Sequence, residues 1–213
     1  KTNHFPAITE PAKVGKLLLM LDSYEGTSTV RAALKLAPLV FVRPKELRHA
    51  EWQEIDLEAA EWRIPAEKMK MGVDHIVPLS SQALEVLQEQ KLLTGNWQYV
   101  FPSVRSPRRP MSDNAILSAF RNMGISKEEM TGHGFRAMAR TLLDEVLGER
   151  VELIEHQLAH AVKDTLGRAY NRTTHLPQRK VMMQRWADYL DQLRVQASSS
   201  NVVMGGFKHV YSR

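Results

Sequence analysis

The chain has 213 residues, 43% of them hydrophobic, which suits one domain built around a single buried core. Its 29 lysines and arginines outnumber its 24 acidic residues and give a net charge of +5, which modestly favours a polyanionic partner. The absence of cysteine excludes disulfides, thiolate nucleophiles and zinc sites built on Cys. Because the sequence has neither a run of roughly 20 apolar residues nor a pattern like a signal peptide, we expect a cytoplasmic protein without a membrane partner.

Two helical patterns come first in the chain. A helix is predicted over residues 12–24, where Pro11 is a start signal. A second helix is expected to begin at Thr27 or Ser28 as N-cap and to kink or end at Pro38. The hydrophobic stripe that predicts the first helix consists of Val14, Leu17, Leu18 and Leu21.

A short helix and a small sheet are expected next. Pro44 suits the first position of a helix, and a residue before proline is pushed out of the helical region, so Arg43 should lie just ahead of it. Between residues 55 and 79 the stretches EIDL, EWRIP and DHIVPL indicate three short strands, with Gly72 in a turn between the last two. This pattern predicts a small antiparallel sheet in a mainly helical protein.

The rest of the chain is predicted to be helical apart from one loop and the end. Ser80 or Ser81 should cap the first of these helices and Ser112 the second. Residues 101–110 (FPSVRSPRRP) are predicted to form a basic, proline-punctuated loop. From residue 197 onward the sequence has little pattern, so we expect a tail that is flexible or docks on a partner. The predicted helices cover residues 82–93, 114–124, 135–148, 151–161, 165–172 and 178–195.

Five short motifs stand in a fixed order along the chain. They are RPKEL with Arg43 and Glu46, KMKMG with Lys70, HGFR with His133 and Arg136, LAHAVKD with His160, and AYNR with Tyr170. Together they resemble the catalytic domain of the tyrosine recombinase family, in particular the integrases of satellite phages and prophages. The resemblance extends over nearly the whole chain, from about residue 11 to residue 194. It implies the DNA breaking-rejoining fold, which is mainly α with a small three-stranded antiparallel sheet.

The resemblance also predicts how the chain is divided. Residues 11–196 would be the catalytic domain, and residues 197–213 the tail, which docks on a neighbouring protomer in many members of the family. Residues 1–10 would be a linker from an upstream DNA-binding region. Because the chain starts at Lys1 and not at Met, we expect a fragment of a longer protein.

The resemblance implies that DNA is cut and rejoined through a 3′-phosphotyrosyl bond to Tyr170, the nucleophile. The resemblance implies that neither a metal nor a nucleotide cofactor is needed, and no ATP is required because this linkage stores the energy of the broken bond. The highly charged transition state must then be stabilised by fixed donors, and the planar guanidinium groups of Arg43 and Arg136 can hold phosphate oxygens. Glu46, three residues on along the same helical face, is expected to orient Arg43. The alternative interpretations are that Arg43 and Arg136 are surface arginines and that Tyr170 is a tyrosine of the core.

Two histidines and a lysine complete the implied site. His133 resembles the histidine that hydrogen-bonds the phosphate and accepts the tyrosine proton, and His160 resembles the one that donates to a non-bridging oxygen. Either could instead be a core histidine. Lys70 resembles the hairpin lysine that protonates the leaving 5′ oxygen. Lys68, two residues away and expected on the same strand face, is the alternative. Ala159 stands where many relatives have glycine, and alanine is tolerated there by its size.

The implied partner is double-stranded DNA carrying attachment sites, bound by four protomers that exchange strands through a four-way junction. Integration or excision of a mobile element would then involve accessory DNA-bending or excision factors and a nucleoid-associated location. Side chains expected near DNA are those of Arg105, Arg108, Arg109, Arg140 and Arg172. The first three could equally belong to a solvated charged loop.

Three other functions are weighed against this one. The first is a basic helical DNA-binding module without catalytic activity, and the second is a type IB topoisomerase, which shares the active-site design. The third is a metallohydrolase, because His156 and His160 are four residues apart on a predicted helix. The zinc-protease pattern needs glutamate after the first histidine, and Gln157 stands there instead.

Overall fold

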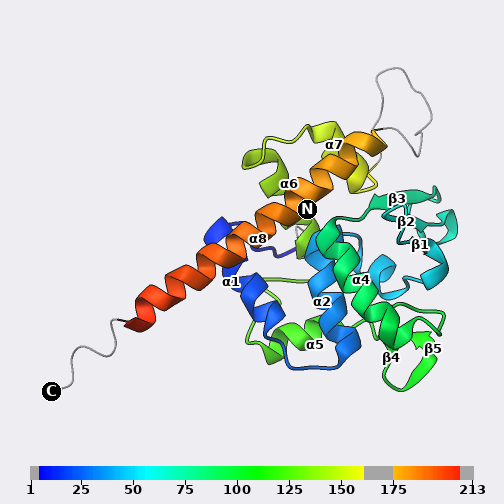
Figure 1. Ribbon diagram of the computed structural model, residues 1–213, viewed down its shortest axis with the longest axis horizontal. Helices are drawn as coiled ribbons and strands as arrows, with labels where there is room; N and C mark the ends of the chain where they lie inside the picture. Colours follow the sequence, from blue (N-terminus) through cyan, green and yellow to red (C-terminus); the bar gives the residue numbers. More distant parts are fainter. Residues whose placement is uncertain (1–4, 161–174, 207–213) are drawn as a thin grey trace.

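The structure, a computed structural model, describes residues 5–160 and 175–206, with side chains described as far as Ser199. Within these residues the chain is mainly helical, with a three-stranded antiparallel sheet and a separate two-stranded hairpin, so the predicted fold class is confirmed (Figure 1). The described α-helices are α1 (Pro11–Asp22), α2 (Ser28–Val40), α3 (Pro44–Arg48), α4 (Ser81–Thr94), α5 (Ala115–Asn122), α6 (Gly134–Glu145), α7 (Val151–Gln157) and α8 (Leu176–Gly206). The strands are β1 (Ile55–Asp56), β2 (Glu61–Ile64), β3 (His75–Pro78), β4 (Pro102–Ser103) and β5 (Ser106–Pro110), and two 3₁₀ helices are η1 (Trp52–Glu54) and η2 (Ala66–Lys68).

The first two helices form where the sequence predicts them, and all four residues of the predicted stripe of α1 are buried. α2 follows Thr27, whose side-chain oxygen accepts a hydrogen bond from the main-chain N–H of Val30 (3.4 Å). Of the predicted kink or end at Pro38, the end is wrong, because α2 continues to Val40 and stops where Phe41 takes a left-handed φ of 37°. The hydrogen bond lost at the proline is tolerated because the last turn is packed in the core.

The predicted antiparallel sheet is present, in the order β1-β2-β3. Trp62 of β2 pairs with Val77 of β3, and both side chains are fully buried, so this face belongs to the core. Gly72 lies in the turn between β2 and β3 with a φ of 63°, which glycine adopts without strain. The prediction that Lys68 and Lys70 share a strand face is wrong, because Lys68 ends η2 and Lys70 lies in the turn.

Residues 101–110, predicted as a loop, form the β4–β5 hairpin instead. The side chain of Phe101 is fully buried and its carbonyl accepts the N–H of Met111 (2.7 Å), which anchors the base of the hairpin. Three prolines hide the strand pattern in the sequence. In a two-stranded ribbon both strands have a free edge, where proline needs no ladder partner.

The start of α5 and the end of α7 also differ from the prediction. α5 begins after Asn114 and not after Ser112, whose side chain accepts the N–H of Asn114 in a turn ahead of the helix. α7 ends at Gln157, although the helix was predicted to run to residue 161. It ends there because Ala159 takes a φ of 48°, a left-handed conformation through which a helix cannot continue.

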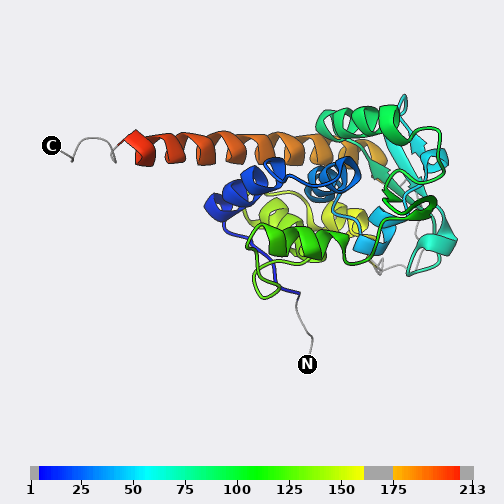
Figure 2. The ribbon, with the colours of Figure 1, turned by 90° about the horizontal axis from the view of Figure 1, so that it is seen from below.

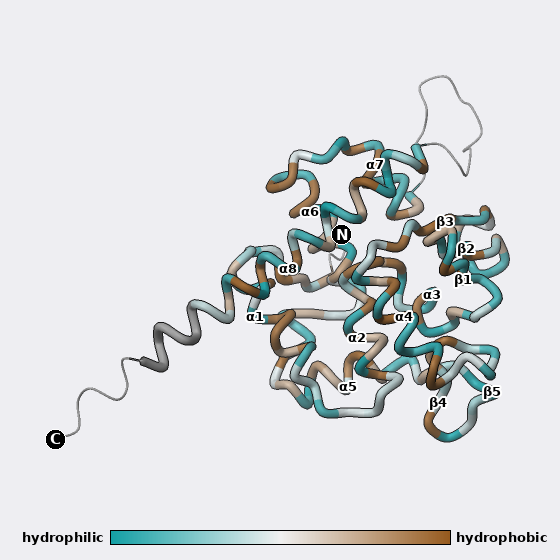
Figure 3. The backbone as a smooth tube through the Cα atoms, in the orientation of Figure 1, coloured by the Kyte–Doolittle hydropathy of each residue, from teal (hydrophilic) through white to brown (hydrophobic). Residues whose placement is uncertain are grey.

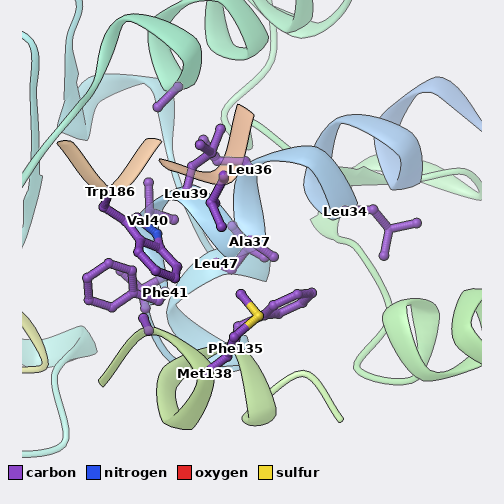
Figure 4. Close-up of a cluster of buried hydrophobic side chains, with 14 of the residues drawn as sticks. Leu34, Leu36, Ala37, Leu39, Val40, Phe41, Leu47, Phe135, Met138 and Trp186 are labelled. Atoms are coloured by element: carbon purple, nitrogen blue, oxygen red, sulfur yellow. The ribbon is translucent and has the colours of Figure 1, made fainter. Parts of the chain in front are cut away.

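The hydrophobic core surrounds α2, which packs against α6 and α8 (Figure 4). Trp186 of α8 donates its indole N–H to the carbonyl of Pro38 (2.8 Å), and its ring meets Phe41 edge-on with centroids 6.1 Å apart. Phe135 and Met138 of α6 belong to the same cluster, as Figure 4 shows. This packing fixes the end of α2, and with it the chain that leads into α3.

Helix α8 packs along α1 and then extends beyond the rest of the domain (Figures 1 and 2). It crosses α1 so closely that a Cβ on Gly15 would lie 2.5 Å from the carbonyl oxygen of Leu193, so only glycine fits. Ala197 is also buried against this crossing. The helix predicted over residues 178–195 therefore continues to Gly206, through residues whose sequence shows no recognisable helical pattern.

Hydrophobic and hydrophilic residues alternate in short stretches along the helices (Figure 3). This is expected of helices that bury one side and expose the other. Among the helices that the structure describes, none is long and apolar enough to cross a membrane.

Candidate active site

Five of the six predicted catalytic residues line one pocket of about 690 Å³. They come from the start of α3, the β2–β3 turn, the start of α6 and the residues after α7. Tyr170, the sixth, lies outside the described residues, as do Arg168 and Arg172. Phe5 also lines the pocket, and Figure 2 shows the N-terminal segment on the side of the domain opposite α8. The full lining is Phe5, Arg43, Lys70, Met71, His133, Arg136, Ala137, Arg140, Leu158, Ala159 and His160.

Arg43 is the N-cap residue of α3, where the following proline puts it. Its guanidinium Nη1 donates to Oε1 of Glu46 (2.7 Å), and its main-chain N–H donates to Oε2 of the same carboxylate (2.8 Å). Glu46 is buried, with 4% of its surface exposed, and the Arg43 side chain keeps 18%. Glu46 therefore holds Arg43 on the pocket wall, and the remaining donors of the guanidinium face Ala159 and the cavity.

Arg136, in the first turn of α6, is held by main-chain carbonyls. Its Nη1 donates to the carbonyl of Phe41 (3.1 Å), and its Nη2 donates to the carbonyl of Leu158 (2.6 Å). Burial and then the charge of nearby Arg43 lower the pKa of Arg136 to about 10, so the group stays charged at neutral pH. Two guanidinium groups are thus held close together at the cost of mutual repulsion, which an anion in the pocket would relieve.

His160 lies after α7 and contacts a residue that sequence reasoning missed. Its Nδ1 is 2.6 Å from Oε2 of Glu155, and its Nε2 is 3.1 Å from Nη2 of Arg136. Because arginine can only donate, Nε2 accepts and Nδ1 carries the proton that is donated to Glu155. Burial would raise the pKa of Glu155, but the hydrogen bond from His160 and the hydrogen bond and charge of Arg140 outweigh it and hold that pKa below its usual range.

His133 is the N-cap residue of α6 and packs against Phe5. The two rings are stacked with centroids 4.3 Å apart and planes 12° apart. Burial, followed by the charges of Arg136 and Arg43, lowers the pKa of His133 and favours the neutral imidazole. A neutral ring can accept a proton, as the base of the predicted reaction must.

The two lysines weighed for one role occupy different surroundings. Lys70 is exposed and lines the pocket beside Met71. Lys68 does not line the pocket and binds the carboxylates of Glu51 (2.6 Å) and Glu54. The geometry therefore places Lys70, and not Lys68, at the candidate site.

The other basic residues expected near DNA lie at the rim or outside the pocket. Arg140 is at the rim and donates from Nε to Glu155 (2.9 Å). The side chains of Arg105, Arg108 and Arg109 are exposed on the β4–β5 hairpin and do not line this pocket.

The geometry does not support a metal site built on His156 and His160. The two histidines do not share a helical face, because α7 ends between them. The buried ring of His156 meets His175 edge-on, whereas His160 faces the pocket. Among the residues that the structure describes, no group of three or more His, Asp or Glu side chains could hold a metal ion.

Comparison with known proteins decides the family. The phage integrase family matches residues 9–176, which is most of the chain. The chain belongs to the phage integrase family. An integrase of Enterobacteria phage P4 is 39% identical over 99% of this chain, and the prophage integrase IntA of Escherichia coli K12 is 37% identical over 94%. The chain spans about half the length of these relatives, 51% and 47% respectively.

A solved structure has a similar fold. The chain superposes on a lambda integrase tetramer bound to a Holliday junction with a TM-score of 0.55 and 21% identity. The match covers 78% of this chain and 48% of the lambda chain. At this identity the likeness concerns the fold alone.

The motifs did not indicate Glu155, which contacts two residues of the pocket lining, or Phe5, which belongs to the lining itself. Glu155 precedes His160 by five residues on a helix that was predicted to continue, and that helix would have pointed the two side chains in different directions. Phe5 reaches the pocket only through the path of the N-terminal segment, for which a single sequence offers no signal.

Proposed function

We propose that this chain is the catalytic domain of a tyrosine-type site-specific DNA recombinase that forms a 3′-phosphotyrosyl intermediate on Tyr170. The observation that supports it best is the convergence of Arg43, Arg136, His160 and Lys70 on one pocket in a chain of the phage integrase family. These residues are far apart in the sequence, and each has a chemical role at a phosphodiester. A basic DNA-binding module without activity would not need a general acid and two preorganised guanidinium groups in one place.

In the proposed reaction the scissile phosphate lies between Arg43 and Arg136. The tyrosine oxygen attacks phosphorus and gives its proton to His133, while the 5′ oxygen leaves and takes a proton from Lys70. Rejoining reverses both transfers, so the linkage conserves the energy of the bond. The fixed carbonyl partners of Arg136 hold its guanidinium in place before DNA binds, which is the preorganisation that stabilises a charged transition state.

His160 would change partners when the phosphate binds. Without DNA its Nε2 accepts from Arg136, and its Nδ1–H is directed to Glu155. A phosphate oxygen is a stronger acceptor for Arg136, so its arrival would release Nε2, which would take up a proton from solvent and donate it in a hydrogen bond to a non-bridging oxygen. Glu155 keeps the ring oriented during this exchange.

The proposed partner is duplex DNA, and the proposed assembly is four protomers on two duplexes. The lambda integrase tetramer on a Holliday junction supports this assembly by likeness of fold. The arginines at 105, 108, 109, 140 and 172 would contact the DNA backbone, and accessory factors would set the direction of recombination near the nucleoid. We further propose that residues 1–10 link the domain of residues 11–196 to an upstream DNA-binding region, and that residues 197–213 serve as a docking tail.

Covalent capture tests the proposed function. The chain is incubated at low salt with excess nicked attachment-site DNA, from which a short fragment diffuses away after cleavage, and the products are separated on a denaturing gel. An adduct is expected with the parent chain, including in excess chelator, and none with Tyr170→Phe, which should still bind DNA. An adduct that persists in Tyr170→Phe, or one that needs zinc, would contradict the proposal.

A further inference from the structure

Lys68 forms an ion-pair cluster outside the pocket that the proposed reaction does not use. Its ammonium group contacts the carboxylates of Glu51 (2.6 Å) and Glu54 and donates to the carbonyl of His49 (3.0 Å). These contacts use all three of its donors. The Lys68 side chain is only 22% exposed, and those of the two glutamates are 9% and 5% exposed. The cluster is therefore a shielded contact and not a surface ion pair.

The cluster is rigid on its acidic side as well. Glu54 also accepts the indole N–H of buried Trp62 (3.0 Å), and Glu51 accepts the side-chain amide of Gln53 (2.6 Å). Lys68 thus binds carboxylates that are already fixed by other residues.

The protonation of Lys68 does not suit a general acid. Burial by itself would lower the pKa of Lys68, but the hydrogen bonds and charges of Glu51 and Glu54 outweigh it and raise that pKa above the ordinary lysine value. Loss of the proton would leave two shielded carboxylates without a cation, which is strongly unfavourable. A proton held in this way is not available to a leaving oxygen.

The cluster lies at the base of the turn that presents Lys70. Met69, between the two lysines, is buried, and Lys70 follows it into the pocket. On the other side of the turn, Asp74 accepts the main-chain N–H of Ala66 (2.8 Å) and closes the base. The turn residues beyond Met69 are exposed, so contacts at the base determine where Lys70 lies.

The acidic partners of Lys68 belong to the segment that follows α3, the helix whose N-cap residue is Arg43. We propose that Lys68 is a positioning residue, which ties the turn carrying Lys70 to the segment carrying Arg43 and so fixes the distance between the general acid and the phosphate-binding arginine. This inference rests on the proposed function, in which Lys70 protonates the leaving oxygen.

A double-mutant cycle on two DNA substrates tests this role. Cleavage rates are measured for Lys68→Met, Lys70→Ala and the double variant, on ordinary DNA and on DNA whose bridging 5′ oxygen is replaced by sulfur. The sulfur leaving group departs without a proton. Displacement of a reacting group by about 1 Å costs on the order of 10²-fold in rate, so Lys68→Met should lose roughly 10- to 10²-fold on ordinary DNA and little on the sulfur substrate. In the Lys70→Ala background it should cause no further loss.

Two further variants separate positioning from folding. Lys68→Arg keeps a cation for both glutamates and should retain most activity, and Glu51→Gln removes one charge and should show a smaller loss that sulfur also repairs. Lys127→Met, at an exposed lysine whose nearest carboxylate is 3.7 Å away, is the matched control and should behave like the parent. Thermal unfolding of each variant shows whether it is folded at the assay temperature.

Three other results of these rate measurements would contradict the proposed role of Lys68 or of Lys70. A Lys68→Met defect that is equal on both substrates would show a general structural role and refute the inference. A defect that adds fully to that of Lys70→Ala would show that Lys68 acts independently, with the same consequence. If Lys70→Ala cleaves ordinary DNA as fast as the parent, the general-acid role of Lys70 in the proposed function fails first, and the inference fails with it.

Discussion

The buried histidine of β3, His75, predicts how the stability of the domain depends on pH. Its side chain is 3% exposed, and its Nε2 is 3.1 Å from the carbonyl of Gln157, so the neutral ring donates to the residue that ends α7. Burial and then the positive charge of Arg179 lower the pKa of His75 from 6.5 to about 3. The folded protein therefore binds the proton of this group more weakly than the unfolded chain does.

The size of the effect follows from linkage. The contribution of His75 to the free energy of unfolding is constant above about pH 7.5, where the ring is neutral in both the folded and the unfolded state. The free energy of unfolding falls as the pH drops from about 6.5 towards 3. At pH 5, which is about 1.5 units below the ordinary histidine pKa, protonation stabilises the unfolded chain but not the folded one. At 1.36 kcal/mol per unit, this lowers the free energy of unfolding by about 2 kcal/mol.

Urea unfolding at pH 7.5, 6 and 5 measures this dependence. His75→Gln removes the titrating group and keeps a donor for the carbonyl of Gln157, so its unfolding free energy should be lower at pH 7.5 but fall less on acidification than that of the parent. The difference in fall between the parent and the variant isolates His75 from the other histidines. Equal falls in the two proteins would show that His75 does not titrate between the folded and unfolded states as a neutral, buried histidine must.

Three further predictions concern the pocket and the packing beneath it. Arg43→Ala and Arg136→Ala should each slow DNA cleavage by roughly 10²- to 10³-fold, the usual cost of losing a preorganised donor, and near-normal single-turnover rates would contradict their role. Phe5→Ala should expose the ring of His133 and raise its pKa towards the ordinary value, which moves the acid limb of the pH–rate profile to higher pH. An NMR titration of His133 that is unchanged in the variant would exclude this effect. Gly15→Val should lower the free energy of unfolding by roughly 1–3 kcal/mol, because the added side chain meets the backbone of α8. Chemical denaturation measures this loss, and parent-like stability would show that the crossing of α1 and α8 can relax.

The sequence was sufficient where local chemistry decides the structure. Pro44 starts α3 and forces Arg43 into the N-cap position, from which Glu46 can reach it, and all of this follows from a span of four residues. The stripe of α1 and the turn at Gly72 are equally local. These features agree with the motifs, so most of the pocket was predicted residue by residue.

The sequence was insufficient where distant segments or unusual backbone conformations decide. The strand pattern in the sequence was read as including both Lys68 and Lys70, which predicted that their side chains share one face. No neighbouring residue in the sequence indicates that Glu51 and Glu54 bind Lys68. At Ala159 the relevant property is a left-handed φ and not the size of the side chain, which explains why glycine would suit this position. The conformation turns the chain out of α7 and brings His160 to Arg136.

If this pocket cleaves DNA through Tyr170, the covalent adduct carries its nucleotide remnant on that one tyrosine, and peptide mapping of the adduct identifies the modified residue. After capture on nicked DNA, digestion with nuclease and trypsin should leave the nucleotide remnant on the peptide of residues 169–172, which trypsin releases by cutting after Arg168 and Arg172. Mass spectrometry should place the added phosphate and nucleoside on Tyr170. A remnant on any of the other four tyrosines, or on a serine or histidine, would contradict the account.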